Sequence, residues 1–284
     1  MTNISYRGPS RVLIVGNGRV ARAFLDQLNR TRRAHTDAGP SSLPFVHWHR
    51  GQTASLHELC LKESPTHVWL AVSDDSIAEF VQNNIECLIG RTVTHFCGGK
   101  PSFRVSHGHK LLQVHVAHPL TTFGDVTHAQ WRDDVDRIPF VLEKPIDEST
   151  PPPKLDELLP GFTNPVFYLA AKDRAYYHAL CALAGGLTVQ LWEALAPRFQ
   201  SELGVPSSAL HHFLHQISRN LSRHLENRKS VLTGPVARGD HQSVVLHKSA
   251  LDQRHEVLLA RLYQDFETLH RCEHERSLLE KRGN

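Results

Sequence analysis

The chain has 284 residues, of which 40% are hydrophobic and 21% charged, and its formal net charge is +3. This length accommodates two domains, and this composition is typical of a soluble globular protein. Lysine and arginine are scattered rather than clustered, so nothing indicates nucleic acid as a partner. We also expect no membrane partner, because no uninterrupted apolar run approaches about 18 residues and the amino terminus lacks the apolar core of a signal peptide.

Cysteine and histidine usage argues against a disulfide framework and against a metal site. The five cysteines are odd in number and widely spaced, which favours reduced thiols and a cytoplasmic protein. The 21 histidines include the pair His47 and His49 and the group His211, His212 and His215. These lack cysteine or carboxylate partners at the spacing of metal ligands, so we expect histidines in solvent or at the edge of the core and no bound metal.

The stretch RVLIVGNGRVA, residues 11–21, predicts a strand, a glycine turn and a helix in that order. The apolar run Val12–Val15 suits a buried parallel strand. Gly16 permits a tight turn, Gly18 lets the backbone approach a pyrophosphate, and Ala21 is small where the helix packs on the strand. Free N–H groups at the start of the helix attract phosphate. The alternative is a chance glycine-rich turn, but we predict a dinucleotide site that includes Gly16, Asn17, Gly18, Arg19 and Val20.

The second strand bears on the choice of cofactor. After a long polar loop at residues 32–44, residues 45–49 read as this strand, and Arg50 follows it. NAD sites usually place an acidic residue here to bind the ribose hydroxyls, and this chain has none. The Arg50 guanidinium suits a 2′-phosphate, which favours NADP over NAD. Otherwise Arg50 is a loop residue in solvent.

Two further predicted strands extend this site. Residues 67–72 read as a buried strand, followed by a helix from Ile77 that Ser76 or Asp75 would cap. Residues 92–97 read as the next strand, which Gly98 closes. In parallel sheets, ligands bind at the carboxyl ends of the strands. The residues that we add to the cofactor site on this ground are Val72, Ser73, Asp74 and Gly98.

The whole pattern predicts the α/β class, with a doubly wound, mostly parallel sheet followed by an all-helical region. More strands are expected at 112–117, 138–142 and 165–170, and the segment 144–160 is rich in proline. Helices are expected at 176–195 and 207–227, and one or two at 241–281. We therefore expect a cofactor-binding domain at residues 1–165 and a helical domain at residues 166–284.

Several motifs resemble one known family. They are GNGRVA, AVSDDSI at 71–77, HFCGG at 95–99, HPLTTF at 118–123, DRAYYHA at 173–179 and, most specifically, LTGPVARGD at 232–240. Together they resemble a Rossmann-like, NADP-binding oxidoreductase family whose carboxyl-terminal helical domain is domain-of-unknown-function family 2520. The family is similar to pyrroline-5-carboxylate reductase, ketopantoate reductase and the β-hydroxyacid dehydrogenases. The resemblance implies NADP as cofactor and a helical domain that often dimerises and completes the active site. It implies no substrate.

One position departs from the family pattern. The first long helix of the family usually carries an Asn a few residues after the Tyr-His-Ala motif, and this chain has Gly186 there. In the distant relatives, polar side chains on this helix contact the reacting carbonyl. The loss of the amide puts the usual chemistry or the usual substrate in question.

Two histidines are candidates for acid–base chemistry. His118 follows the carboxyl end of a predicted strand, and His178 lies on the helix expected to face the cleft. The usual pKa of histidine, near 6.5, suits proton transfer at neutral pH. Each could instead be a hydrogen-bonded histidine that orders a loop or helix.

The LTGPVARGD loop contributes two further candidates. Arg238 could clamp a carboxylate or phosphate of the substrate, with Asp240 beside it. Equally, Arg238 and Asp240 could pair with each other and hold the turn between two helices. We also expect a homodimer, because the apolar helix at 176–195 and the apolar stripe Leu258, Leu262, Phe266 and Leu269 together exceed what a small helical domain covers.

These observations favour an NADP-dependent oxidoreductase that transfers hydride to or from a small carbonyl or imine compound, with a substrate that can carry an anionic group. The alternative is a dimeric NADP-binding sensor or scaffold without turnover. Gly186 favours this alternative, whereas convergence of His178, Arg238 and Asp240 in space would favour the enzyme.

Overall fold

The computed structural model describes residues 10–34, 43–124, 135–147, 149–227 and 230–282. Most of the polar loop expected at 32–44 lies outside these residues. The chain divides into two compact units, Met1–Trp192 and Glu193–Asn284. The sequence analysis placed a domain boundary after residue 165, whereas the first compact unit continues into the helix that follows the sheet. That boundary stays a prediction.

The first unit is built on an eight-stranded sheet of order β2-β1-β3-β4-β6-β7-β8, with β5 paired to β6 outside this order. Parallel pairs join β2, β1, β3, β4 and β6, and β7 with β8, while β6 pairs with β7 and β5 in antiparallel fashion. The strands are β1 (Val12–Val15), β2 (Phe45–Trp48), β3 (His67–Leu70), β4 (Thr92–His95), β5 (Phe103–His107), β6 (Lys110–Pro119), β7 (Phe140–Glu143) and β8 (Val166–Leu169).

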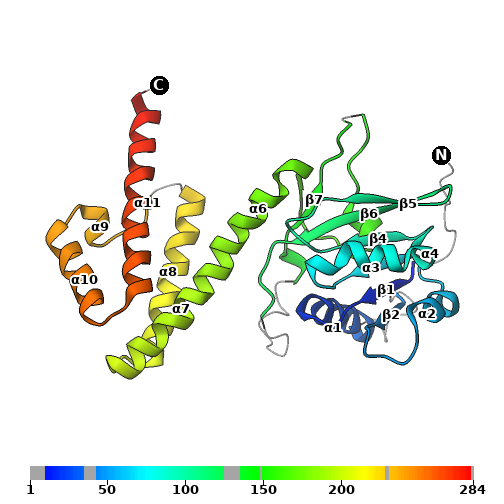
Figure 1. Ribbon diagram of the computed structural model, residues 1–284, viewed down its shortest axis with the longest axis horizontal. Helices are drawn as coiled ribbons and strands as arrows, with labels where there is room; N and C mark the ends of the chain where they lie inside the picture. Colours follow the sequence, from blue (N-terminus) through cyan, green and yellow to red (C-terminus); the bar gives the residue numbers. More distant parts are fainter. Residues whose placement is uncertain (1–9, 35–42, 125–134, 148, 228–229, 283–284) are drawn as a thin grey trace. The chain divides into compact units, whose positions relative to one another are not determined.

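Helices cover both faces of the sheet, as a doubly wound fold requires (Figure 1). Val12 and Ile14 of β1 face one apolar cluster with α1 and α5, whereas Leu13 and Val15 face a second cluster with α2, α3 and α4. The near-continuous apolar strands follow from this burial on both sides. These helices are α1 (Arg19–Ala34), α2 (Leu56–Glu63), α3 (Ile77–Asn83), α4 (Ile85–Leu88) and α5 (Leu155–Leu158).

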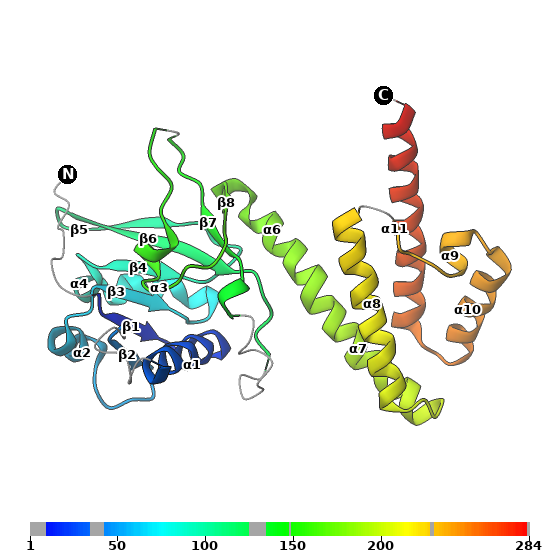
Figure 2. The ribbon, with the colours of Figure 1, turned by 180° about the vertical axis from the view of Figure 1, so that it is seen from behind.

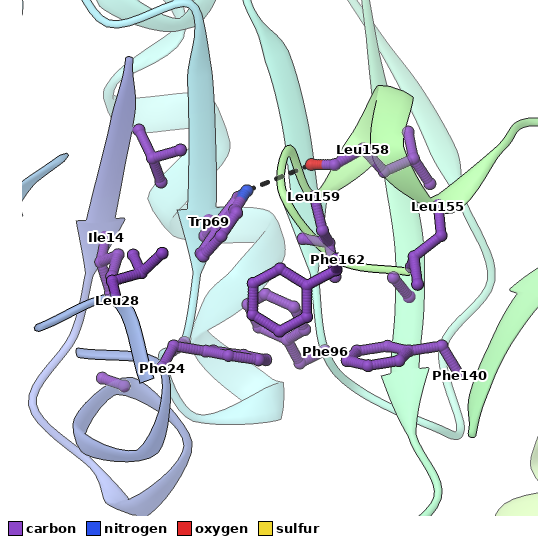
Figure 3. Close-up of a cluster of buried hydrophobic side chains, with 14 of the residues drawn as sticks. Ile14, Phe24, Leu28, Trp69, Phe96, Phe140, Leu155, Leu158, Leu159 and Phe162 are labelled. Carbon is purple, nitrogen blue, oxygen red and sulfur yellow. Dashed lines mark hydrogen bonds between the residues drawn. The ribbon is translucent and has the colours of Figure 1, made fainter. Parts of the chain in front are cut away.

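Aromatic rings fill the cluster between the sheet and α1 (Figure 3). Phe24 of α1 lies 5.6 Å from Trp69 of β3 and 5.7 Å from Phe162, measured between ring centroids. The Trp69 indole Nε1 donates a hydrogen bond to the Leu158 carbonyl oxygen at 3.1 Å. This bond satisfies a buried polar atom and ties the proline-rich segment to the sheet.

One strand was not predicted from the sequence. Residues 103–107 form β5, which pairs with β6 through a tight turn in which Gly108 has a φ of 58°. The strand is short and partly exposed, and the only sign of it in the sequence is the alternation of apolar and polar residues in FRVSH. Beyond it, β6 is longer than the expected 112–117. The predicted fold class is confirmed, with β5 and the β7–β8 pair running antiparallel to the other strands.

After β8 the described chain is helical (Figure 2). A continuous helix comprises η4 (Ala171–Asp173), α6 (Arg174–Cys181), η5 (Ala182–Leu187), α7 (Thr188–Pro197) and η6 (Arg198–Glu202), of which η5 and η6 are π-helical. Gly186 lies in the first π-helical segment, where the wider turn departs from the regular helix that the sequence predicted. The remaining helices are α8 (Ser207–Asn227), α9 (Pro235–Arg238), α10 (His241–Gln253) and α11 (Val257–Arg282).

The helix at residues 171–202 is long and apolar enough to cross a membrane, judged by length and composition alone. None of its most apolar 18-residue window is buried in the structure, and a core helix of a soluble protein passes the same test. The sequence predicted a helix at 176–195 but no membrane span, because polar residues interrupt its apolar ones. Its exposed apolar side chains include Leu180, Leu183, Leu187 and Val189.

Candidate functional site

The order of the strands places a crevice at the carboxyl ends of β1 and β3. Strand β1 pairs with β2 on one side and with β3 on the other, so the chain changes direction across the sheet after β2. Helices therefore diverge to opposite faces at this point, and the loops after the two strands leave a gap between them. A pocket of about 860 Å³ lies here.

The turn after β1 has the geometry that the sequence predicted. Gly16 has a φ of 118°, and any Cβ at this position would clash with the carbonyl oxygen of Ala71. Among the described residues, no atom lies within 4 Å of where the Cβ of Gly18 would stand, so its backbone faces open space. Helix α1 starts at Arg19 and points its first N–H groups to the turn. This arrangement can receive a phosphate group.

A histidine holds this turn, and the sequence analysis gave it no role. His47 of β2 places its Nε2 at 2.6 Å from the carbonyl oxygen of Gly16. A carbonyl oxygen can only accept, so the His47 Nε2 carries the proton and donates it to this bond. The signal available in the sequence was position, since β2 lies beside β1 and His47 stands near the carboxyl end of its strand.

The residues assigned to the cofactor come together in this pocket. Each of them lines it except Gly98, which directly follows the lining residue Cys97. Trp48 and Phe80 add aromatic walls, with ring centroids 6.2 Å apart. Arg50 is exposed at the rim, and among the described residues no ion pair involves it.

The loop after β3 forms the opposite wall. Residues Asp74–Ser76 make a 3-10 turn before α3, and the expected side-chain cap from Ser76 is absent because its hydroxyl contacts Ser73 Oγ at 2.7 Å. Asp75 makes an ion pair with Lys100 at 3.9 Å instead of capping. Burial, and then a hydrogen bond with Asp74, raise the pKa of the Cys97 thiol to about 11. Cys97 is therefore a neutral thiol at physiological pH, unsuited to nucleophilic chemistry.

The two candidate histidines lie together beside Gly98. The rings of His118 and His178 are 5.5 Å apart and almost perpendicular. A methyl group on Gly98 would stand 2.5 Å from His178 Nδ1 and 2.9 Å from His118 Nε2, so a side chain here would displace the two rings. Burial, followed by the charges of His178 and Arg174, lowers the pKa of His118 to about 4. His118 is thus uncharged at neutral pH.

A buried ion pair anchors the helix that carries His178. Arg174 is 0% exposed, and its Nε lies 3.2 Å from Glu143 Oε2 at the end of β7. Glu143 also accepts a hydrogen bond from the backbone N–H of Ser102 at 2.9 Å. Removing either partner would leave a buried charge alone, which is strongly destabilising. The pair fixes α6 at the carboxyl edge of the sheet, and the sequence analysis did not identify it.

Arg238 and Asp240 lie in the second compact unit. Gly239 has a φ of 66° and ends the short helix α9, while Asp240 Oδ1 accepts a hydrogen bond from Ser243 N at 3.2 Å and caps α10. Hydrogen bonds from Ser243, and then the charge of Arg238, lower the pKa of Asp240. Asp240 thus has a structural task, and the assignment of both residues to an active site stays a prediction.

Comparison with known families supports the resemblance seen in the sequence. Residues 138–267 match the family model described as "Domain of unknown function (DUF2520)". This match confirms the predicted resemblance over the end of the sheet and most of the helical region. No curated protein matches the sequence.

Solved structures share this fold. A candidate NADP oxidoreductase from Bacteroides fragilis is 19% identical, with 94% of this chain and 98% of that chain covered and a TM-score of 0.64. A protein from Thermotoga maritima is 21% identical, with 93% and 99% covered and a TM-score of 0.53. A reductive aminase from Aspergillus terreus, in complex with NADPH and ethyl-5-oxohexanoate, is 14% identical, with 97% and 96% covered and a TM-score of 0.52.

The open space above Gly18 gives a direct test of the phosphate site. We predict that Gly18→Asp weakens NADPH binding by more than about tenfold, because a carboxylate would occupy the place of the pyrophosphate. Calorimetric titration measures the affinity, and circular dichroism checks that the variant is folded. Gly124→Asp is the matched control, since Gly124 also has no described neighbour within 4 Å of its Cβ position but is not among the residues that line the pocket. Equal NADPH affinity of Gly18→Asp and the wild type would refute the site.

Proposed function

We propose that this protein is an NADP-dependent oxidoreductase that transfers hydride to or from a small carbonyl or imine compound. The observation that carries the proposal is the pocket at the carboxyl ends of β1 and β3, where the Gly16 turn and the start of α1 meet. A pyrophosphate bound there would lie at the amino terminus of α1, as in other dinucleotide-binding folds.

The rim of the pocket supports NADP as the cofactor. Arg50 stands exposed in the loop after β2, and Arg19 lines the same pocket at the start of α1. The residues from Trp48 to Ala54 include no acid that would bind ribose hydroxyls and repel a phosphate. A guanidinium can bind a 2′-phosphate through two parallel hydrogen bonds.

The residues around Gly98 support a site for the proton transfer that accompanies hydride transfer. The cofactor would supply or accept the hydride, and a protein group must supply or accept the proton. His178 is the candidate for this proton transfer, because its Nδ1 is buried and without a hydrogen-bond partner in the described part of the chain. An unsatisfied buried nitrogen costs about 1–3 kcal/mol, so a bound polar group is its natural partner. The reductive aminase of similar fold holds NADPH together with a keto ester, which also favours a carbonyl or imine substrate.

A second candidate function is a dimeric NADP-binding sensor or scaffold without turnover. The observation that favours it is Gly186, which provides no side chain and has no atom of the described residues within 4 Å of where its Cβ would stand. If an amide at this place is essential to the family's reaction, this chain binds the cofactor without using it.

Turnover separates the two candidates. We expect NADPH oxidation, followed by absorbance, with at least one member of a panel of small ketones, keto acids and cyclic imines. His178→Asn should then lower kcat by about 10²–10⁴-fold and leave NADPH affinity unchanged, because a positioned acid typically contributes that much. His107→Gln, an exposed histidine on β5, is the matched control. Tight NADPH binding without oxidation across the panel would favour the sensor.

Cofactor preference tests the role of Arg50. We predict that NADPH binds more tightly than NADH by roughly ten- to a hundredfold, since one charge-assisted contact contributes about 1.5–3 kcal/mol. Arg50→Ala should remove this preference, while Arg104→Ala, an exposed arginine on β5, should keep it. Titration with both cofactors measures the ratio. Equal affinities in the wild type, or an unchanged preference in Arg50→Ala, would contradict the assignment.

We also propose that the protein is a twofold homodimer through its helical region. Exposed apolar side chains lie along residues 171–202 and along α11, where Leu258 is 76% and Leu269 is 62% exposed. A second copy would remove these surfaces from water.

The five cysteines are all free, which supports a reducing compartment such as the cytoplasm.

Light scattering at micromolar concentration should give twice the chain mass of 32.0 kDa. Leu183→Glu should shift the mass toward the monomer, because a carboxylate is costly in an apolar interface. Leu61→Glu, at another exposed leucine on α2, should remain dimeric. A monomer mass for the wild type would end this proposal.

A further inference from the structure

We infer that Tyr177 is a positioning residue for His118: its hydroxyl donates to His118 Nδ1 and thereby fixes the ring proton on Nε2, so that His118 serves the site as a neutral hydrogen-bond donor. The catalytic meaning of this arrangement rests on the proposed function. The tautomer itself does not, because it follows from groups within the first compact unit.

The contact is short and geometrically defined. His118 Nδ1 and the Tyr177 hydroxyl oxygen are 2.9 Å apart, and the two rings meet edge to face at 5.6 Å. His118 stands on β6 and Tyr177 on α6, which the Arg174–Glu143 pair anchors to the end of β7. The bond therefore joins two fixed elements rather than two loops. The distance alone leaves open which atom carries the proton.

The protonation states of both partners narrow the choice. Burial, and then a hydrogen bond with Cys181, raise the pKa of Tyr177, so the phenol keeps its proton. His118 remains neutral for the reasons given above, and the charged or titratable groups that face it are Tyr177, Arg174 and His178 of α6 and Asp74 of the turn before α3. A neutral imidazole has one nitrogen that donates and one that accepts.

The relative strengths of the two donors and the two acceptors decide the direction. A phenol O–H is a more acidic donor than the N–H of a neutral imidazole, and the bare imidazole nitrogen is a more basic acceptor than the phenol oxygen. For the contact between His118 Nδ1 and the Tyr177 hydroxyl, the direction from Tyr177 to His118 is therefore the more stable. The proton of His118 then resides on Nε2.

This tautomer directs an N–H group to the site of the proposed chemistry. His118 Nε2 and His178 Nδ1 both border Gly98, the neighbour of pocket-lining Cys97. His178 Nδ1 has no hydrogen-bond partner in the part of the chain that the structure describes. A neutral N–H can hold a carbonyl oxygen or imine nitrogen while charge develops on it, without giving up its proton. The roles of the two histidines thus differ: His118 orients and polarises the acceptor atom, and His178 transfers the proton.

Nitrogen NMR reads the tautomer directly. In protein labelled with ¹⁵N-histidine, two-bond ¹H–¹⁵N spectra distinguish protonated from bare ring nitrogens, and His118→Gln identifies the signals of His118. Between pH 6 and 8 we expect a proton on Nε2 and none on Nδ1. In Tyr177→Phe we expect a mixture of tautomers, whereas Tyr176→Phe, the exposed neighbour on the same helix, should leave the signals unchanged. A proton on Nδ1 in the wild type, or a Tyr177→Phe spectrum identical to that of the wild type, would overturn the inference.

Kinetics then tests the consequence. With any substrate that supports turnover, Tyr177→Phe should lower kcat about three- to tenfold at unchanged NADPH affinity, the effect expected for one hydrogen bond. Tyr176→Phe should keep the wild-type kcat. An unaltered kcat in a Tyr177→Phe variant whose tautomer has changed would overturn the positioning role. If no substrate turns over, the NMR result still decides the tautomer, so failure of the proposed function and failure of this inference remain distinguishable.

Discussion

The close approach of two backbone segments at Gly16 is the constraint on which the candidate site depends. Gly16 N donates to the Trp48 carbonyl oxygen at 2.9 Å, and Ala71 N donates to the Val15 carbonyl oxygen at 2.8 Å, so the ends of three strands are tied together. Any side chain at Gly16 would strike the Ala71 carbonyl. Because the turn is tight, α1 starts directly above the sheet and directs its free N–H groups into the pocket.

Burial of charge and of polar groups organises the second part of the site. The buried Arg174 guanidinium is compensated by the Glu143 carboxylate instead of by water. This ion pair holds in place the helix that carries Tyr177 and His178. Gly98 supplies the space that lets both imidazoles approach the loop after β4. Burial then keeps His118 neutral, and this neutrality makes it a hydrogen-bond partner rather than an acid at physiological pH. The site therefore has two parts. Backbone geometry at the Gly16 turn forms the cofactor pocket, and buried side chains form the neighbouring group of His118, Tyr177 and His178.

The sequence predicted the local elements well where one pattern dominates. The apolar run of β1, its glycine turn and the boundaries of α8 emerged from composition and spacing. It failed where tertiary contacts decide. The short edge strand β5 has weak alternation and owes its existence to pairing with β6. The role of Tyr177 depends on its contact with His118, which lies 59 residues away in the chain. The Arg174–Glu143 ion pair likewise joins residues far apart in the sequence, so local spacing does not predict it. The sequence predicted that Arg238 clamps the substrate. Arg238 lies in the second compact unit, so the clamp stays a prediction.

Hydrogen–deuterium exchange with and without NADPH tests the central claim most directly, because it observes the backbone N–H groups that would bind the pyrophosphate. The account predicts slower exchange on NADPH addition in peptides that cover residues 16–22, where the glycine turn passes into α1. It also predicts slower exchange in the loop after β2 that contains Arg50. Binding of NADPH at saturating concentration with no change in exchange at residues 16–22 would contradict it.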